Sequence, residues 1–172
     1  DVFDPERLRS IIGELAAEAK PTRHVAGPHF EHVLTAVDGS VVRTLSTIAE
    51  AAYLKNIHGA SRSGWRLHTH FDVDRSVPTR IDVTSGKNSG KTDEKNVLRQ
   101  NLQADHCYVM DRWYAQFALF NDIHAANSSY VCRVRDNSRY ESLETRPLSA
   151  EAVAAGVLSD EAVELGTSGP AA

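Results

Sequence analysis

Residues 107–114 read CYVMDRWY: an apolar run leads straight into Asp111, and an arginine and two aromatic residues follow. A continuous apolar run of this kind is typical of a strand that is covered on both faces, as strands of parallel sheets are. Asp111 is then expected at the carboxyl end of its strand, where open α/β sheets place their ligand sites. Residues 32–37 have the same form and lead into Asp38, which Gly39 and Ser40 follow.

Two strands that each bring an aspartate to the same edge of one sheet predict a metal site. Two carboxylates held close together repel each other, and a divalent cation between them removes the repulsion. We therefore predict that the strands ending at Asp38 and Asp111 are parallel neighbours whose carboxylates share a cation. The residues leave one alternative open, in which each aspartate only caps the turn or helix that follows it.

The composition is that of a soluble globular domain. The chain has 172 residues, of which 41% are hydrophobic, and it has neither an apolar run of membrane-spanning length nor a signal-peptide pattern. For this reason we expect no membrane partner. The two cysteines, Cys107 and Cys132, fit a reducing cytoplasm. The net charge of −4 means that any binding of nucleic acid comes from a local basic patch, from a metal, or from parts of the protein not present here. The chain starts on Asp1 and stops without a closing element, so both ends are expected to be cuts through a longer protein.

Hydrophobic periodicity predicts the elements of the first half. A helix begins at Pro5 and a connector follows it, and the strand 32–37 comes before a short strand at 41–45, a short helix at 47–56 and a loop at 61–64. Residues 65–73 and 78–84 form a hairpin. Its first strand alternates, so that one face is predicted to be buried and the other polar and outward: the buried face has Trp65, Leu67, Thr69, Phe71 and Val73, and the polar face has Arg66, His68, His70 and Asp72.

In the second half helices and strands alternate. A helix capped by Thr92 comes before the strand that ends at Asp111, and a helix at 114–125 and a strand at 129–134 follow. This order predicts an α/β fold in which helices pack on a mixed sheet. Beyond residue 137 the pattern is weaker and more polar, with a strand at 139–145, a short helix at 150–155 and a strand at 160–165. This last part is predicted to be the unfinished start of an inserted subdomain.

Three further groups of residues carry alternative chemistry. Residues 86–92 read GKNSGKT, which resembles a nucleotide-binding loop, although Ser85 stands where that pattern needs glycine. The simpler interpretation is a solvated turn. A third interpretation is that Lys87 and Lys91 contact a nucleic-acid backbone. His68, His70 and Asp72 lie on one strand face with a spacing that can bind zinc. The alternative is that they simply form the polar outer face of the strand. Arg133, Arg135 and Arg139 form a basic cluster that is either solvated or, if Asp111 ends the neighbouring strand, in contact with phosphate.

Four segments together resemble the DDE transposases of bacterial insertion sequences, most closely the IS-four type. They are residues 37–40 (VDGS), the hairpin, residues 109–114 (VMDRWY) and residues 130–137 (YVCRVRDN). The resemblance implies a ribonuclease-H-like mixed sheet flanked by helices, with the start of a β-rich insertion at the C-terminus. It implies an N-terminal helix and linker at 1–29, a partial catalytic core at 30–137 and a truncated insertion at 138–172. In that fold the first and fourth core strands lie side by side and carry the catalytic aspartates, which are Asp38 and Asp111 here.

The chain departs from the family pattern at two places. The second motif of the family commonly reads Asp-Arg-Gly-aromatic, and here Trp113 replaces the glycine and narrows the space beside the metal. The third carboxylate belongs to a motif Tyr-x-x-Arg-x-x-x-Glu-x6-Lys. Tyr130 and Arg133 have its first spacing, but Asn137 stands in place of the glutamate and Glu144 in place of the lysine. We expect that the third catalytic glutamate is not in this chain, because the chain stops inside the insertion; the alternative is a degenerate gene copy.

The resemblance also implies a reaction and its partners. Mg²⁺ or Mn²⁺ held by Asp38, Asp111 and the missing glutamate supports phosphodiester cleavage and strand transfer in DNA transposition. The expected partners are transposon-end DNA and, in the full-length protein, a second copy; the expected location is the cytoplasm, on the nucleoid when DNA is bound. Weak DNA contacts are expected from Lys87, Lys91, Arg112, Arg133 and Arg135. The chain alone is expected to be inactive, and a nucleotide-binding domain or a non-catalytic transposase remnant are the alternatives.

Overall fold

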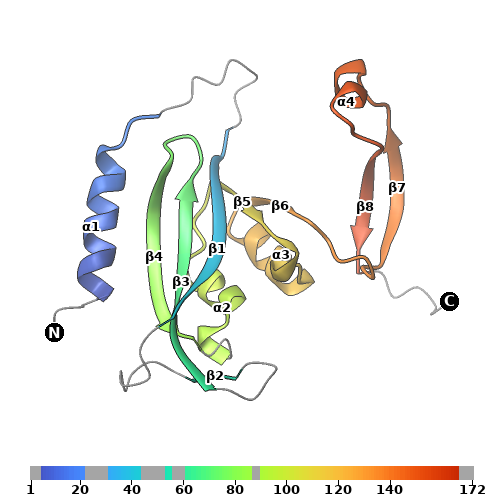
Figure 1. Ribbon diagram of the computed structural model, residues 1–172. Coiled ribbons are helices and arrows are strands. Elements are labelled where there is room, and N and C mark those ends of the chain that lie inside the picture. The colour runs from blue at the N-terminus through green and yellow to red at the C-terminus, as the bar shows by residue number, and fades with distance from the viewer. Residues whose placement is uncertain (1–4, 22–30, 44–52, 56–60, 87–89, 167–172) are drawn as a thin grey trace. The chain divides into compact units, whose positions relative to one another are not determined.

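The computed structural model describes residues 5–21, 31–43, 53–55, 61–86 and 90–166, which form two compact units, 1–133 and 134–172 (Figure 1). Within these ranges no helix is long and apolar enough to cross a membrane. The first unit consists of α1 (Pro5–Glu18), β1 (Val33–Arg43), β2 (Tyr53–Lys55), β3 (Ser61–Asp72), β4 (Val77–Ser85), η1 (Gly90–Thr92), α2 (Glu94–Gln100), β5 (His106–Met110), η2 (Arg112–Tyr114), α3 (Phe117–Ala125) and β6 (Ser129–Cys132).

One mixed sheet organises the first unit. Its strands lie in the order β4–β3–β1–β5–β6, and β2 pairs with the first residues of β3. Strands β4, β3 and β1 are antiparallel neighbours, whereas β1, β5 and β6 run parallel. The parallel pairs are joined through helices, as parallel strands require. This is the mixed α/β sheet flanked by helices that the sequence predicts, and the predicted parallel pairing of the two aspartate-bearing strands is confirmed.

The core lies between one face of this sheet and the helices α2 and α3. Tyr108, Leu119, Ile123, Thr35 and Cys107 are fully buried. Val97 and Leu98 form the inner side of α2, and Phe120 of α3 stacks on Tyr130 of β6 with ring centroids 4.2 Å apart. Helix α1 packs along β4, as Figure 1 shows, through Ile12 and Ala16, while Leu8, Ile11 and Leu15 are exposed.

The predicted faces of β3 are the wrong way round. His68, His70 and Asp72 are buried, with exposed fractions of 3%, 7% and 3%, whereas the alternating apolar residues on the other face are only half-buried. The polar face tolerates burial because three of its side chains, Arg66, His68 and Asp72, each have a charged or hydrogen-bonding partner. Arg66 forms an ion pair with Glu94 of α2, Asp72 with Arg75, and His68 hydrogen-bonds to Thr84 of β4.

Several predicted boundaries are also wrong. Strand β1 is a single strand of 11 residues that runs through Asp38, because β3 pairs with it as far as Arg43. Residues 53–55, predicted as the end of a helix, form β2, and the predicted loop at 61–64 belongs to β3, because these two segments pair with each other. The rest of the predicted helix at 47–56 lies outside the described residues. Asp93, rather than Thr92, caps α2 by accepting the Lys95 N–H.

The second unit is a hairpin with a short helix. It contains β7 (Tyr140–Arg146), α4 (Ala150–Ala154) and β8 (Asp160–Leu165), close to the ranges predicted from the sequence. The two strands pair antiparallel, and Ser149 caps α4 by accepting the Ala152 N–H. Every residue of β7 is exposed. The β-rich character predicted for this part is confirmed.

Candidate active site

Asp38 lies in the middle of β1, on the face of the sheet opposite to α2. Its strand neighbours Val37 and Gly39 point the other way, because side chains alternate along a strand. Val37 is buried, whereas Asp38 is exposed. Asp38 pairs with Thr69 of β3 on one side. On its other side β5 has already ended, which leaves the carboxylate open to solvent.

The register between β1 and β5 places Asp111 next to Asp38. The paired residues run from Val33 with His106 to Ala36 with Val109, so each β1 residue faces the residue 73 positions later. The same offset takes Asp38 to Asp111, which is still extended and directly follows β5. Adjacent strands lie about 5 Å apart, and residues in register share a face. The two carboxylates are therefore neighbours on one face.

Tyr114 is the buried residue of the short helix η2 that follows Asp111. Its side chain is buried, with 3% exposed, and burial raises the pKa of its hydroxyl. The negative charges of Asp38 and Asp111 each raise this pKa further.

Asp111 is held by the turn that follows it. Its carboxylate Oδ1 accepts the backbone N–H of Trp113 at 2.9 Å, so that Asp111 caps the short helix η2. Its carbonyl oxygen accepts the N–H of Tyr114 at 3.2 Å and the Cys132 thiol of β6 at 3.3 Å. The capping role that the sequence left as the alternative is therefore real, and it coexists with the pairing of the two aspartates.

Gly39 lets α2 approach the strand directly behind Asp38. A Cβ at this position would collide with the carboxylate of Glu94, which forms an ion pair with Arg66 of β3. Glu94 and Arg66 are both largely buried, with side-chain exposures of 7% and 14%. This ion pair packs against the backbone of β1 on the covered face of the sheet. The sequence gives no signal for this role of Glu94, because the two partners lie 28 residues apart.

Residues 29–165 match the transposase DDE domain. The chain belongs to this family. No curated protein matches the chain. Among solved structures it is similar to a piggyBac transposase in a synaptic complex with hairpin DNA, with 14% sequence identity, a TM-score of 0.45, and coverage of 62% of this chain and 24% of that chain. The chain thus spans about a quarter of the length of that transposase. The resemblance inferred from the sequence is confirmed at the level of the family.

The alternative sites receive no support in this DDE domain. His68 and His70 are buried against Thr84 and Tyr108, and burial lowers the pKa of each. Asp72 forms an ion pair with Arg75. The three residues predicted to bind zinc therefore have structural roles in the fold. Of the suspected nucleotide loop, residues 87–89 with Lys87 lie outside the described ranges. Residues Gly90–Thr92 form a short 3₁₀ turn before the cap of α2.

Some of the predicted basic contacts lie near the aspartates and others do not. Each β5 residue pairs with the β6 residue 22 positions later, up to Met110 with Cys132. One step further, the same offset places Arg133 beside Asp111. Arg112 directly follows Asp111, and both arginines are exposed. Lys91 is exposed in η1, and Arg135 belongs to the second unit. Sequence reasoning missed Lys95, whose ammonium lies 4.4 Å from the centre of the Trp113 ring.

The two aspartates are ligands of the type that a hard divalent cation prefers, but two carboxylates are too few to complete its site. Two exposed carboxylates on adjacent strands are the oxygen ligands that Mg²⁺ and Mn²⁺ prefer. Among the described residues, no group of three His, Cys, Asp or Glu side chains is placed to hold a metal ion. Members of the family generally depend on divalent metal ions, and Asp38 with Asp111 is the pair here that matches that chemistry.

Proposed function

We propose that this chain is part of the catalytic domain of a DNA transposase, and that Asp38 and Asp111 are its first two catalytic carboxylates. The observation that carries the proposal is the common register of β1 and β5, which sets these two residues side by side on the solvent-exposed face. No other pair of exposed carboxylates among the described residues shares neighbouring parallel strands. The substrate in this proposal is the phosphodiester backbone at a transposon end.

Each residue has a defined role in this proposal. Asp38 and Asp111 supply the carboxylate oxygens that hold Mg²⁺ or Mn²⁺. When bound, such ions activate the attacking oxygen and stabilise the leaving oxygen of an in-line phosphoryl transfer. The cap between Asp111 and Trp113 fixes one carboxylate, and the Gly39–Glu94 contact fixes the strand beneath the other. Arg133 and Arg112 contact the phosphates next to the scissile bond, with Lys87, Lys91 and Arg135 as weaker contacts.

The third carboxylate comes from outside the described residues. The late glutamates Glu141, Glu144, Glu151, Glu161 and Glu164 belong to the second unit, in which β7 and β8 form a hairpin with the short helix α4. Two-metal chemistry needs ligands for both ions. We therefore propose that this chain alone binds a cation weakly and does not cleave DNA at a useful rate.

Metal binding tests the assignment directly. We expect Mn²⁺ titration followed by calorimetry to show weak binding that Asp38→Asn and Asp111→Asn each reduce strongly. Glu161→Gln is the matched control, since it removes one exposed carboxylate from the second unit, and His70→Ala tests the histidine alternative. Equal loss in all four variants, or a preference for zinc, would contradict the assignment.

A nuclease assay tests the incomplete site. The full chain and its Asp38→Asn variant are incubated with a labelled DNA end and Mn²⁺, and cleavage is followed on a denaturing gel. We expect neither to cut above background. Robust cleavage that disappears in the variant would show that a glutamate of this chain completes the site, and it would overturn the proposal of a missing third ligand.

The wider biology belongs to the same proposal. Bringing two transposon ends together requires two copies of the protein, so the full-length protein is expected to be a homodimer on DNA in the cytoplasm, associated with the nucleoid. Sedimentation of the full-length protein with and without end DNA measures this directly.

A further inference from the structure

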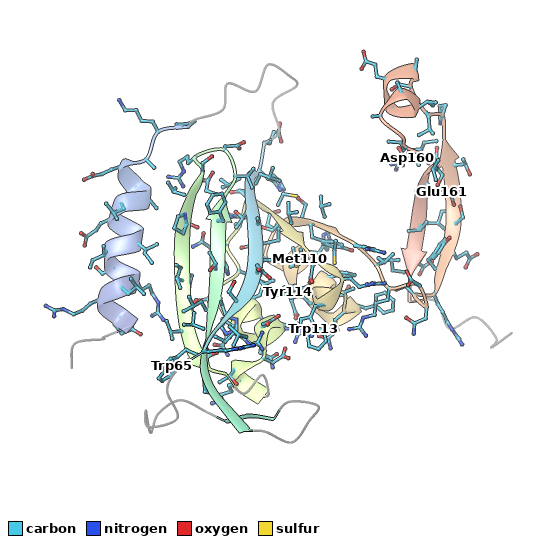
Figure 2. The ribbon with its side chains drawn as sticks, viewed as in Figure 1. Trp65, Met110, Trp113, Tyr114, Asp160 and Glu161 are labelled. Atoms are coloured by element: carbon cyan, nitrogen blue, oxygen red, sulfur yellow. The ribbon has the colours of Figure 1, made fainter. Side chains whose placement is uncertain are left out.

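Trp113 is an exposed indole directly beside the aspartate pair. Half of its surface is exposed, although its neighbour Tyr114 is buried. Figure 2 shows the two aromatic side chains close to each other beside α3, near the end of β5, with Trp65 well apart on β3. The backbone of Trp113 is fixed, because its N–H is donated to Asp111 Oδ1. A large aromatic ring is therefore held at the edge of the site without being part of the core.

A cation orients this ring. The ammonium group of Lys95 lies over the indole, 4.4 Å from the ring centre, within the range of a cation–π contact. Lys95 is itself placed by the first turn of α2, where its N–H is donated to Asp93 Oδ1 at 3.0 Å. The lysine occupies one side of the ring, and the exposed half of the residue remains open to solvent.

We propose that Trp113 is a stacking platform for an unpaired base of the DNA end that enters the aspartate site. This inference rests on the proposed function and names the form of its substrate. Aromatic rings flanked by positive charge bind single-stranded nucleic acid because every base offers a π-face, while the cation attracts the backbone. A base inside a duplex is already stacked on both sides, so the platform selects ends with unpaired nucleotides over blunt duplex.

The expected effect is specific to single strands. Removing an aromatic stacking partner weakens binding by about ten-fold per base, and this part of the affinity does not depend on salt. Phosphate contacts, by contrast, weaken as salt rises. Trp113→Ala should therefore lower affinity for a single-stranded oligonucleotide at every salt concentration and leave the affinity for blunt duplex unchanged, whereas Trp113→Phe should retain most of the single-strand affinity.

The chain provides its own reporter for this test. It has two tryptophans, so Trp65→Phe leaves Trp113 as the sole source of indole fluorescence. We expect a short single-stranded oligonucleotide to quench that fluorescence, and the same oligonucleotide with an abasic terminal residue to quench it much less. Titrating in EDTA separates this result from the metal site, since a failure of metal binding by Asp38 and Asp111 leaves the stacking measurement intact.

Controls make the outcome decisive. Lys95→Gln should weaken quenching, whereas Lys20→Gln removes an exposed lysine far from Trp113 in sequence and should not. Circular dichroism checks that each variant is folded. Equal quenching by duplex and single strand, equal losses for both in Trp113→Ala, or no effect of the abasic residue would overturn the proposal.

Discussion

Three histidines on the covered face of the sheet are kept neutral by the fold. Burial, and to a smaller extent the charge of Arg80, lower the pKa of His70 to about 4. Burial is also the main cause that lowers the pKa of His68 and of His106. Asp82, which pairs with His68 in the register of β3 and β4, acts in the opposite direction and raises the pKa of both His68 and His70. Protonating any of these rings places a charge in a site that is poorly solvated.

This arrangement predicts a loss of stability in mild acid. An unfolded histidine has a pKa near 6.5, so the stabilisation from neutral His70 is complete above that value and is lost as the pH falls from 6.5 to about 4. The linkage amounts to about 3 kcal/mol for His70 alone. Urea unfolding at pH 7.5, 6 and 5 should show the decline, and His70→Gln should make it shallower. A midpoint that does not change between pH 7.5 and 5 would contradict the prediction.

Gly39 is the position where one methyl group should matter most. A Cβ there would meet the Glu94 side chain, with its Cγ at 2.9 Å. We expect Gly39→Ala to lower the free energy of unfolding by about 1–3 kcal/mol, the usual cost of overpacking. Gly13→Ala is the matched control: nothing lies within 4 Å of its Cβ, and in a helix alanine is favoured over glycine by about 1 kcal/mol. Equal effects of the two substitutions in urea unfolding would argue against the close contact.

At the scale of elements, the buried ion pair between Arg66 and Glu94 connects the sheet to α2. Removing Glu94 leaves the buried Arg66 without this carboxylate, and breaking such a buried pair costs about 3–5 kcal/mol. The same pair lies behind Gly39 and therefore behind Asp38. The packing of α2 on β3 and the placement of Asp38 thus depend on one contact.

The pair predicts a non-additive double-mutant cycle. Glu94→Leu alone should destabilise the protein strongly, because it leaves the Arg66 charge buried without its carboxylate. The double variant Arg66→Met with Glu94→Leu should regain much of the loss, since apolar side chains of similar volume replace buried pairs well. Thermal unfolding of the single and double variants measures the coupling. Additive losses would show that the two side chains act independently.

At the scale of the whole molecule, charge and packing are divided unequally between the two units. Residues 134–172 contain seven acidic and three basic residues, so they account for the net charge of −4, while residues 1–133 carry sixteen of each sign. No described residue of the second unit is buried. A two-stranded hairpin without a core is at best marginally stable. The first unit, in contrast, contains the buried cluster around Tyr108.

Hydrogen exchange should separate the two units. We expect the amides of β7 and β8 to exchange quickly through local opening, and those of β5 to exchange only on global unfolding. Mass spectrometry of the intact chain after deuterium labelling, with peptides covering both regions, measures the difference. Similar protection in β5 and β7 would mean that the hairpin is stabilised as part of the core.

The sequence by itself determined most of the helices and strands and the parallel pairing of the two aspartate-bearing strands. The unbroken apolar run before Asp111 requires a strand buried on both faces, and the alternation at 65–73 requires a hairpin strand, so the order of strands and helices was readable. Once both aspartate-bearing strands are parallel neighbours, Asp38 and Asp111 come close to each other. The capping of η2 by Asp111 was also foreseeable, because aspartate favours that position.

Only the tertiary structure decided which face of each strand is covered. A period of two residues defines two faces on β3 but does not say which one meets the helices. The polar face is the buried one because Arg66 and Asp72 find charged partners there and His68 finds a hydroxyl. In the same way, pairing with β3 extends β1 past Asp38 and makes β2 a strand. Local patterns record only near neighbours in the chain, whereas burial and strand pairing depend on partners that folding brings together from distant positions.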